Sequence, residues 1–212
     1  MVRVLVFVKR AHYEIAAVTL TGAGKILFVN LLEQKFWFIV LAGGGWLLYL
    51  VTTSRQHPDY LRSWGFQKQG FWPSMRLLGI PALVVTLASC IYGLIAGHAI
   101  VSWHIIPVLV LYPLWGTIQQ WLVISLFGGN MLKTGAFAQS ITYLLTALLF
   151  AVIHYPSGLL MAGTFALALT YLVTFARHQN VYALGLYHGW LGGVFYYFAL
   201  GRDPWMEFID KL

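Results

Sequence analysis

Two histidines lie inside long apolar stretches, where a polar ring is costly unless it has a partner or a task. His154 ends the sequence FAVIH, and His188 opens the sequence HGWLG. Two adjacent glutamines, Gln119 and Gln120, lie in a third apolar stretch. Imidazole and carboxamide groups can hydrogen-bond a peptide carbonyl, and an imidazole can also take up a proton. Because polar groups inside membrane segments commonly mark functional positions, these four residues are the first candidates for chemistry.

Each candidate also has a simpler structural explanation. A histidine or glutamine in a membrane helix often serves only as a hydrogen-bond partner for a neighbouring helix. Helical spacing places Gly185, His188 and Gly189 on one face, which favours the close approach of another helix. Gln119 and Gln120 likewise follow a glycine by about one turn. We therefore expect both faces to point into a helical bundle rather than toward lipid.

The composition indicates the kind of element that positions these residues. The chain has 212 residues, of which 60% are hydrophobic and 9% are charged, and its mean hydropathy is +0.76. Soluble domains carry about 25% charged residues. In a membrane every backbone polar group must be bonded internally, which leaves helices as the open-chain solution. The fold class that we predict is all-α, a polytopic transmembrane helical bundle.

Apolar runs separated by Gly, Pro, Asn or charged residues predict about seven spanning helices. The first run is interrupted by TGAGK, so it either spans or lies at the interface, and the charge pattern favours spanning. We expect a single membrane domain over 1–212, in which N-terminal helices and a loop (1–76) precede a core bundle (77–212). The predicted spans are 13–32, 36–53, 77–97, 102–127, 136–154, 158–176 and 181–200.

The distribution of charge predicts orientation and excludes some function classes. The loop 54–76 carries four Lys or Arg residues against the single acid Asp59, so this loop and the N-terminus are predicted to be cytoplasmic. The net charge of +7 lies mainly in loops, which fits anionic lipid headgroups and not nucleic acid. The only cysteine, Cys90, excludes a disulfide within the chain.

The last four helices resemble the CPBP family, the CAAX-prenyl endopeptidases and bacteriocin-processing membrane proteases also called Abi. Its motifs EExxxR, FxxxH and HxxxN have counterparts here in the same order, over roughly 102–200. QQWLVI (119–124) stands at the first place, FAVIH matches the second in full, and HGWLG keeps the histidine of the third. The resemblance implies a CAAX-protease-like core in a prokaryotic plasma membrane. It also implies a membrane-embedded or lipidated peptide as the partner.

The departures from the family pattern concern the catalytic machinery. By resemblance, Gln119 and Gln120 replace the glutamate pair, while His154 and His188 keep the positions that bind the substrate carbonyl. Phe150 matches its motif, Ile124 replaces the arginine and Gly192 replaces the asparagine.

A carboxamide does not titrate near neutral pH, so Gln119 cannot take a proton from water as a carboxylate does. Loss of a general base typically lowers a rate by about 10²–10⁴. Glu14 and Glu33 are the distant acids that could fold back toward the site. We therefore expect a pocket for a peptide or lipidated segment that cleaves weakly, by an altered mechanism, or not at all.

The sequence is also compatible with two other interpretations of the histidines, as cofactor ligands or as structural residues of a scaffold. His154 and His188 could be the axial ligands of a haem, in which case they face each other across a slot. Zinc, with His104 as a third ligand, lacks the usual thiolate or carboxylate. The chain could also be a scaffold that binds another membrane protein, with both histidines structural. We expect no cofactor, with haem as the runner-up, and the family resemblance predicts that both histidines converge beside Gln119.

Overall fold

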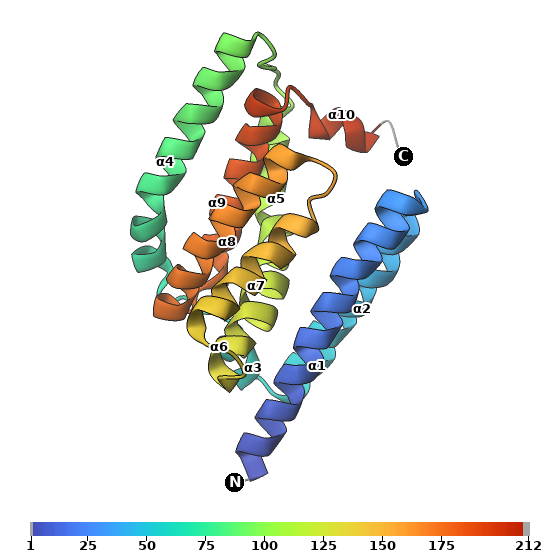
Figure 1. Cartoon of the computed structure of the whole chain (residues 1–212), viewed down its shortest axis with the longest axis vertical. Coiled ribbons are helices and arrows are strands. Elements are labelled where there is room, and N and C mark those ends of the chain that lie inside the picture. Colours follow the sequence, from blue (N-terminus) through green and yellow to red (C-terminus); the bar gives the residue numbers. More distant parts are fainter. Residues whose placement is uncertain (1, 210–212) are drawn as a thin grey trace. The chain divides into compact units, whose positions relative to one another are not determined.

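The computed structural model describes residues 2–209, and every regular element in that range is a helix (Figure 1). The prediction of an all-α chain is confirmed. Helix α7 (Gln139–Val152) is apolar but shorter than a full crossing, and the predicted span 181–200 is not among the segments that qualify. Five segments of the described chain are long and apolar enough to cross a membrane: Phe7–Leu31, Lys35–Gln56, Phe71–Ala96, Ile105–Thr134 and Gly158–His178.

The chain forms two compact units, each built from segments far apart in the sequence. The first unit combines the chain up to Gln67 with Trp121–Gln179. The second combines Lys68–Gln120 with the chain from Asn180 onward. The boundary between the units therefore falls inside the long helical segment that carries the two glutamines.

The first unit begins with a helix that is longer than the sequence predicts. The stretch TGAGK does not interrupt it, because α1 (Val2–Gly24) continues directly as the π-helix η1 (Lys25–Leu31). Gly22 packs against the side chains of Leu149 on α7 and Ile153 at its end. A Cβ added to Gly22 would lie 3.2 and 3.3 Å from them, so a larger residue would be crowded. The other elements of this unit are α2 (Lys35–Gln56), α3 (Asp59–Ser63), the π-helix η2 (Trp121–Gly129), α6 (Asn130–Thr134), α7 and α8 (Gly158–His178).

The core of the first unit lies around η2, where eight of the nine residues are buried. Trp121 packs edge-on against Trp46 and Trp64, with ring centroids 5.7 and 5.5 Å apart. Gly128 lies against Thr146 and Leu172, so α7 and α8 both approach this segment closely. Burial of large aromatic side chains contributes about 1.5–3 kcal/mol each, and this cluster therefore anchors η2.

The second unit contains α4 (Phe71–Ala96), α5 (Ile105–Gln120), α9 (Val181–Val194), the π-helix η3 (Phe195–Ala199) and α10 (Pro204–Ile209). Asn180 caps α9, because its Oδ1 accepts a hydrogen bond from the Ala183 backbone N–H at 3.0 Å. Gly97 ends α4 in the left-handed conformation (φ 72°), which a glycine adopts without strain.

Helices α5 and α9 are in backbone contact through glycines. A Cβ on Gly185 would collide with the backbone of Thr117, and a Cβ on Gly189 would collide with the backbone of Tyr112 and Pro113. Gly116 on α5 meets α9 in the same way. This small-residue contact is typical of membrane helices and fixes which side chains of α5 and α9 can meet.

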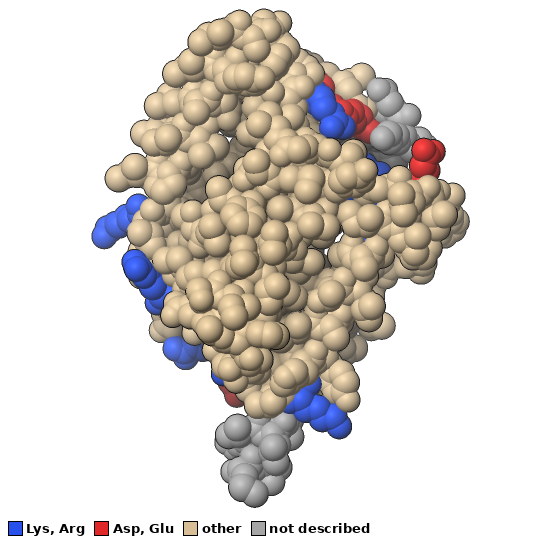
Figure 2. Space-filling view, viewed as in Figure 1, with Lys and Arg blue, Asp and Glu red and all other residues tan. Residues whose placement is uncertain are grey.

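Large apolar side chains cover the outside of the helices. On α4, Ile80 and Ile95 are 74% and 82% exposed. None of the residues of α2, all within the described chain, is buried. Most of the surface visible in Figure 2 carries no Lys, Arg, Asp or Glu. Such a surface matches hydrocarbon rather than water, in agreement with spanning helices.

Candidate functional site

The second unit brings Gln119 on α5 and His188 on α9 together. Nε2 of His188 lies 2.7 Å from Oε1 of Gln119. An amide oxygen only accepts hydrogen bonds, so Nε2 carries the proton and donates. Both side chains are half-buried. The glycine contacts between α5 and α9 place the two backbones close enough for this direct bond.

Gln120 follows in the chain and is fully buried. Among the residues that the structure describes, neither Oε1 nor Nε2 of Gln120 has a hydrogen-bond partner. A buried polar group without a partner typically costs about 1–3 kcal/mol. Its carboxamide offers one acceptor oxygen and two donor hydrogens, which is the complement of a peptide group.

His154 lies just beyond the end of α7, in the first unit. Its Nδ1 donates to the backbone carbonyl of Phe150 at 2.7 Å, and its ring meets the Phe150 ring edge-on at a centroid distance of 5.0 Å. The Phe150 side chain is fully buried. The FxxxH spacing thus has a local structural role, since the histidine satisfies a carbonyl in the last turn of the helix.

The predicted site residues therefore fall into two groups. Gln119, Gln120 and His188 lie in the second unit, and Gly192 lies there too, with Tyr112 Cδ2 3.9 Å from the position of an added Cβ. Phe150 and His154 lie in the first unit. The convergence of His154 on the other residues stays a prediction.

The histidines have partners that bear on metal binding. Nε2 of His188 is engaged with Gln119, and Nδ1 of His104 lies 2.7 Å from Oδ2 of Asp203. Within residues 2–209 no group of three or more His, Cys, Asp or Glu side chains is arranged to hold a metal ion. A haem iron would have to displace Gln119 to reach Nε2 of His188.

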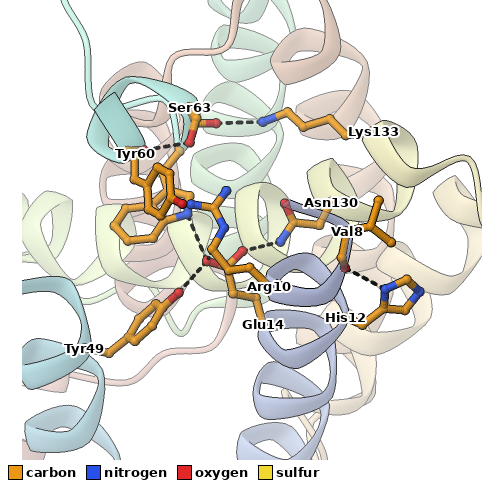
Figure 3. Close-up of polar contacts among 10 residues, drawn as sticks. Val8, Arg10, His12, Glu14, Tyr49, Tyr60, Ser63, Asn130 and Lys133 are labelled. Carbon is orange, nitrogen blue, oxygen red and sulfur yellow. Dashed lines mark hydrogen bonds and ion pairs between the residues drawn. The ribbon is translucent and has the colours of Figure 1, made fainter. Parts of the chain in front are cut away.

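A second polar cluster surrounds Glu14 in the first unit (Figure 3). Glu14 is only 3% exposed. Its Oε1 accepts from the Tyr49 hydroxyl at 2.5 Å and from Trp64 Nε1 at 3.2 Å, and its Oε2 accepts from Asn130 Nδ2 at 2.5 Å. Nε of Arg10 lies 3.6 Å from Oε1 as an ion pair. A buried carboxylate is tolerated when it is surrounded by donors and a countercharge in this way.

Two cations lie at the edge of the Glu14 cluster. The Arg10 guanidinium stacks on the Tyr60 ring, 3.7 Å from its centroid. Its Nε and Nη1 are buried and have no hydrogen-bond acceptor among the described residues. Lys133 instead donates to the Ser63 carbonyl at 2.7 Å. The Arg10 side chain therefore keeps donor capacity that the protein itself does not use.

The Glu14 cluster adjoins a cavity of about 650 Å³ between α1 and α2, which run side by side in Figure 1. This volume lies within the range of small-molecule pockets, about 300–1,000 Å³. The wall is mostly apolar away from the charged cluster. The lining residues are Lys9, Arg10, Tyr13, Glu14, Ala17, Thr21, Leu41, Ala42, Gly45, Trp46 and Tyr49.

None of the sequence motifs includes the residues of this region. The available signals were an ionisable residue in an apolar helix and the i,i+4 spacing of Arg10 and Glu14, which places both on one face. The three hydrogen-bond partners of Glu14 lie 35, 50 and 116 residues away in the chain, so no local pattern could supply them.

Comparisons of the chain with protein-family models, with curated proteins and with solved structures find no match. The resemblance to the CPBP family therefore rests on the motifs alone. Any function has to be argued from the two polar sites and their surroundings.

Proposed function

We propose that this chain binds a membrane-embedded or lipidated peptide segment through Gln119, Gln120 and His188 of the second unit, without efficient hydrolysis. The observation that carries the proposal is the 2.7 Å hydrogen bond between His188 and Gln119. It supports a common site for the first and third motif positions of the family resemblance. The role of His154 rests on the resemblance.

The groups at this site suit a peptide backbone. The carboxamide of Gln120 is buried and has no described partner, so a peptide carbonyl and N–H would satisfy its donors and its acceptor. The NH₂ group of Gln119 offers further donors on the same helix. A bound segment would thereby relieve the cost of an unsatisfied polar group, which is a source of affinity.

The same groups are poor catalysts of hydrolysis. Neither glutamine titrates near neutral pH, and Oε1 of Gln119 already accepts from His188. Several acids of the described chain are engaged elsewhere. Glu14 is held by its own cluster, and Glu207 pairs with Arg202 at 2.6 Å. Oxyanion stabilisation without a general base leaves a weak catalyst at best.

Binding and cleavage can be measured on the full chain in lipid nanodiscs. The probe is a dansyl-labelled farnesylated peptide, compared with the same peptide without its farnesyl group. Wild-type protein is expected to bind the farnesylated probe and to return it intact, as seen by mass spectrometry. Gln119→Glu is expected to raise cleavage, because it introduces a carboxylate beside His188.

His188→Phe removes the donor to Gln119 while keeping a flat ring, and is expected to weaken binding about tenfold. His12→Phe is the matched control, since His12 is exposed on α1 and donates only to the Val8 carbonyl. Equal binding by His188→Phe and His12→Phe would refute the proposed site. If wild-type protein cleaves the probe, and does so as fast as Gln119→Glu, the non-catalytic role is refuted.

A further inference from the structure

We propose that the cavity between α1 and α2 binds an acidic membrane lipid, with its anionic headgroup on Arg10 and Lys9 and its acyl chain along the apolar wall. The cavity belongs wholly to the first unit. This inference is independent of the proposed peptide site, because it uses none of the residues of that site.

The shape of the cavity suits a lipid chain. One wall is the α1 face with Ala17 and Thr21, and the other is the α2 face with Leu41 and Ala42. Gly45 contributes only its backbone, and a Cβ built there meets no described atom within 4 Å. The volume of about 650 Å³ is therefore open along α2, where no side chain fills it.

The charges at the other end of the cavity suit an anion. Glu14 accepts hydrogen bonds from Tyr49, Trp64 and Asn130, and its Oε1 also faces Arg10 Nε as an ion pair at 3.6 Å. Two cations, Lys9 and Arg10, line the cavity beside this one carboxylate.

Nη1 of Arg10 is buried and has no hydrogen-bond acceptor among the described residues, and Nε faces Glu14 Oε1 only at ion-pair distance, 3.6 Å. A phosphate or carboxylate oxygen would supply the acceptor that the guanidinium lacks. The charge balance and this unused donor capacity both favour an anionic group over a cationic one.

The position of the cations along α1 suits a headgroup. Lys9 and Arg10 precede the apolar lining residue Ala17 by about two turns of α1, so they lie toward its N-terminal end. Lys9 is exposed at the same level. Basic residues at the end of a spanning helix attract anionic lipids. A free anion would use only the charged end, whereas a lipid also fills the apolar part of the cavity.

The test is native mass spectrometry of the full chain, purified in detergent and titrated with phosphatidylglycerol or with phosphatidylcholine. Wild-type protein is expected to retain phosphatidylglycerol at least about tenfold more strongly, because charge-assisted hydrogen bonds favour the anionic headgroup. Gly45→Leu fills the cavity and is expected to abolish this preference. Gly44→Leu is the matched control, since it adds the same side chain to the adjacent position, which has equal space and does not line the cavity.

Arg10→Gln and Lys9→Gln test the headgroup contacts, with the larger loss expected for Arg10→Gln. Lys9 is exposed and outside the Glu14 hydrogen bonds, so Lys9→Gln keeps the test valid if Arg10→Gln fails to fold. Equal retention of the two lipids by wild-type protein, or equal effects of Gly45→Leu and Gly44→Leu, would overturn the proposal. Displacement of phosphatidylglycerol by an equal concentration of inorganic phosphate would reduce the site to a simple anion site and would overturn it as well.

Discussion

The Glu14 cluster and the Gln119–His188 pair handle polar groups in apolar surroundings in different ways. The cluster holds a carboxylate with donors from three other segments and lies beside an open cavity. The pair joins an imidazole and a carboxamide between helices whose backbones touch at glycines. The carboxylate thus has a shell of partners, whereas the imidazole and the amide meet through one direct bond. The difference teaches that the buried acid belongs to the first unit and the two motif carboxamides to the second.

The largest loss of stability is expected when Glu14 is replaced. Glu14→Leu leaves Arg10 without its ion-pair partner and three hydrogen-bond donors without their acceptor, so the free energy of unfolding is expected to fall by about 3–5 kcal/mol. Thermal unfolding in detergent checks this loss. Glu14→Gln keeps one acceptor oxygen and should lose less. Glu33→Gln, at an exposed position, should stay within about 0.5 kcal/mol of wild type. A stable Glu14→Leu variant would mean that the shell around the carboxylate is dispensable.

The next largest effect is expected where α5 and α9 touch. Gly189→Ala places a Cβ against the backbone of Pro113, which has to move, so unfolding should become easier by roughly 1–3 kcal/mol. Gly192→Ala on the same helix has room, with its nearest neighbour 3.9 Å away, and should be neutral or slightly stabilising. Equal melting temperatures for both variants would contradict the close contact.

The Gln119–His188 bond should show a smaller but coupled effect. Gln119→Leu leaves Nε2 of His188 without its acceptor and is expected to cost about 1 kcal/mol. In a double-mutant cycle with His188→Leu, the two losses should fall short of additivity by at least about 0.5 kcal/mol. Additive losses would show that the two residues act separately.

The smallest effect concerns Asp203, outside the spanning segments. Burial opposes its ionisation, but hydrogen bonds from His104 and Tyr197 and from the backbone N–H groups of Trp205 and Met206 lower the pKa of Asp203 below its usual value of 3.8. The ionised form is therefore favoured by folding. Its stabilising effect is present above pH 4 and is lost as the pH falls through the lowered pKa.

This pH dependence can be isolated with Asp203→Asn. Melting curves between about pH 6 and pH 3 should show wild-type protein losing its advantage over the variant at the acid end. The difference is expected to be about 1 kcal/mol or less, because the His104–Asp203 pair is partly exposed. If the difference in stability between wild-type protein and Asp203→Asn is the same at every pH in this range, Asp203 is not the source of the pH dependence.

The helical segments could be predicted from the sequence because their signals are local. The predicted span 158–176 became α8 (Gly158–His178), and 36–53 became α2 (Lys35–Gln56). Long apolar runs set the helices, and Gly, Pro and Asn set their ends. The main local difference is in the first helix, which begins at Val2 rather than at residue 13 and continues through TGAGK. There the glycines serve close packing, and the apolar residues that follow them keep the chain helical.

The sites could be predicted only in part, because their partners depend on tertiary structure. The motif order indicated Gln119 and His188, which the fold joins directly. It did not indicate that His154 would bind its own helix, although a histidine four residues after Phe150 near a helix end allows this bond. The partners of Glu14 come from α2, from the turn that follows α3, and from α6, which no spacing in the sequence connects.

The exposure of α2 has a consequence for the order in which the chain assembles. Membrane helices can insert first and associate afterwards, so the element with the least buried surface is expected to dock last. The links of α2 to the rest of the first unit run through half-exposed aromatic side chains, among them Trp46 bonded to Thr21 and Tyr49 bonded to Glu14. If α2 docks last, the α2 wall of the cavity forms only after α1 has packed against η2. The proposed lipid could then bind beside α1 before the cavity is complete.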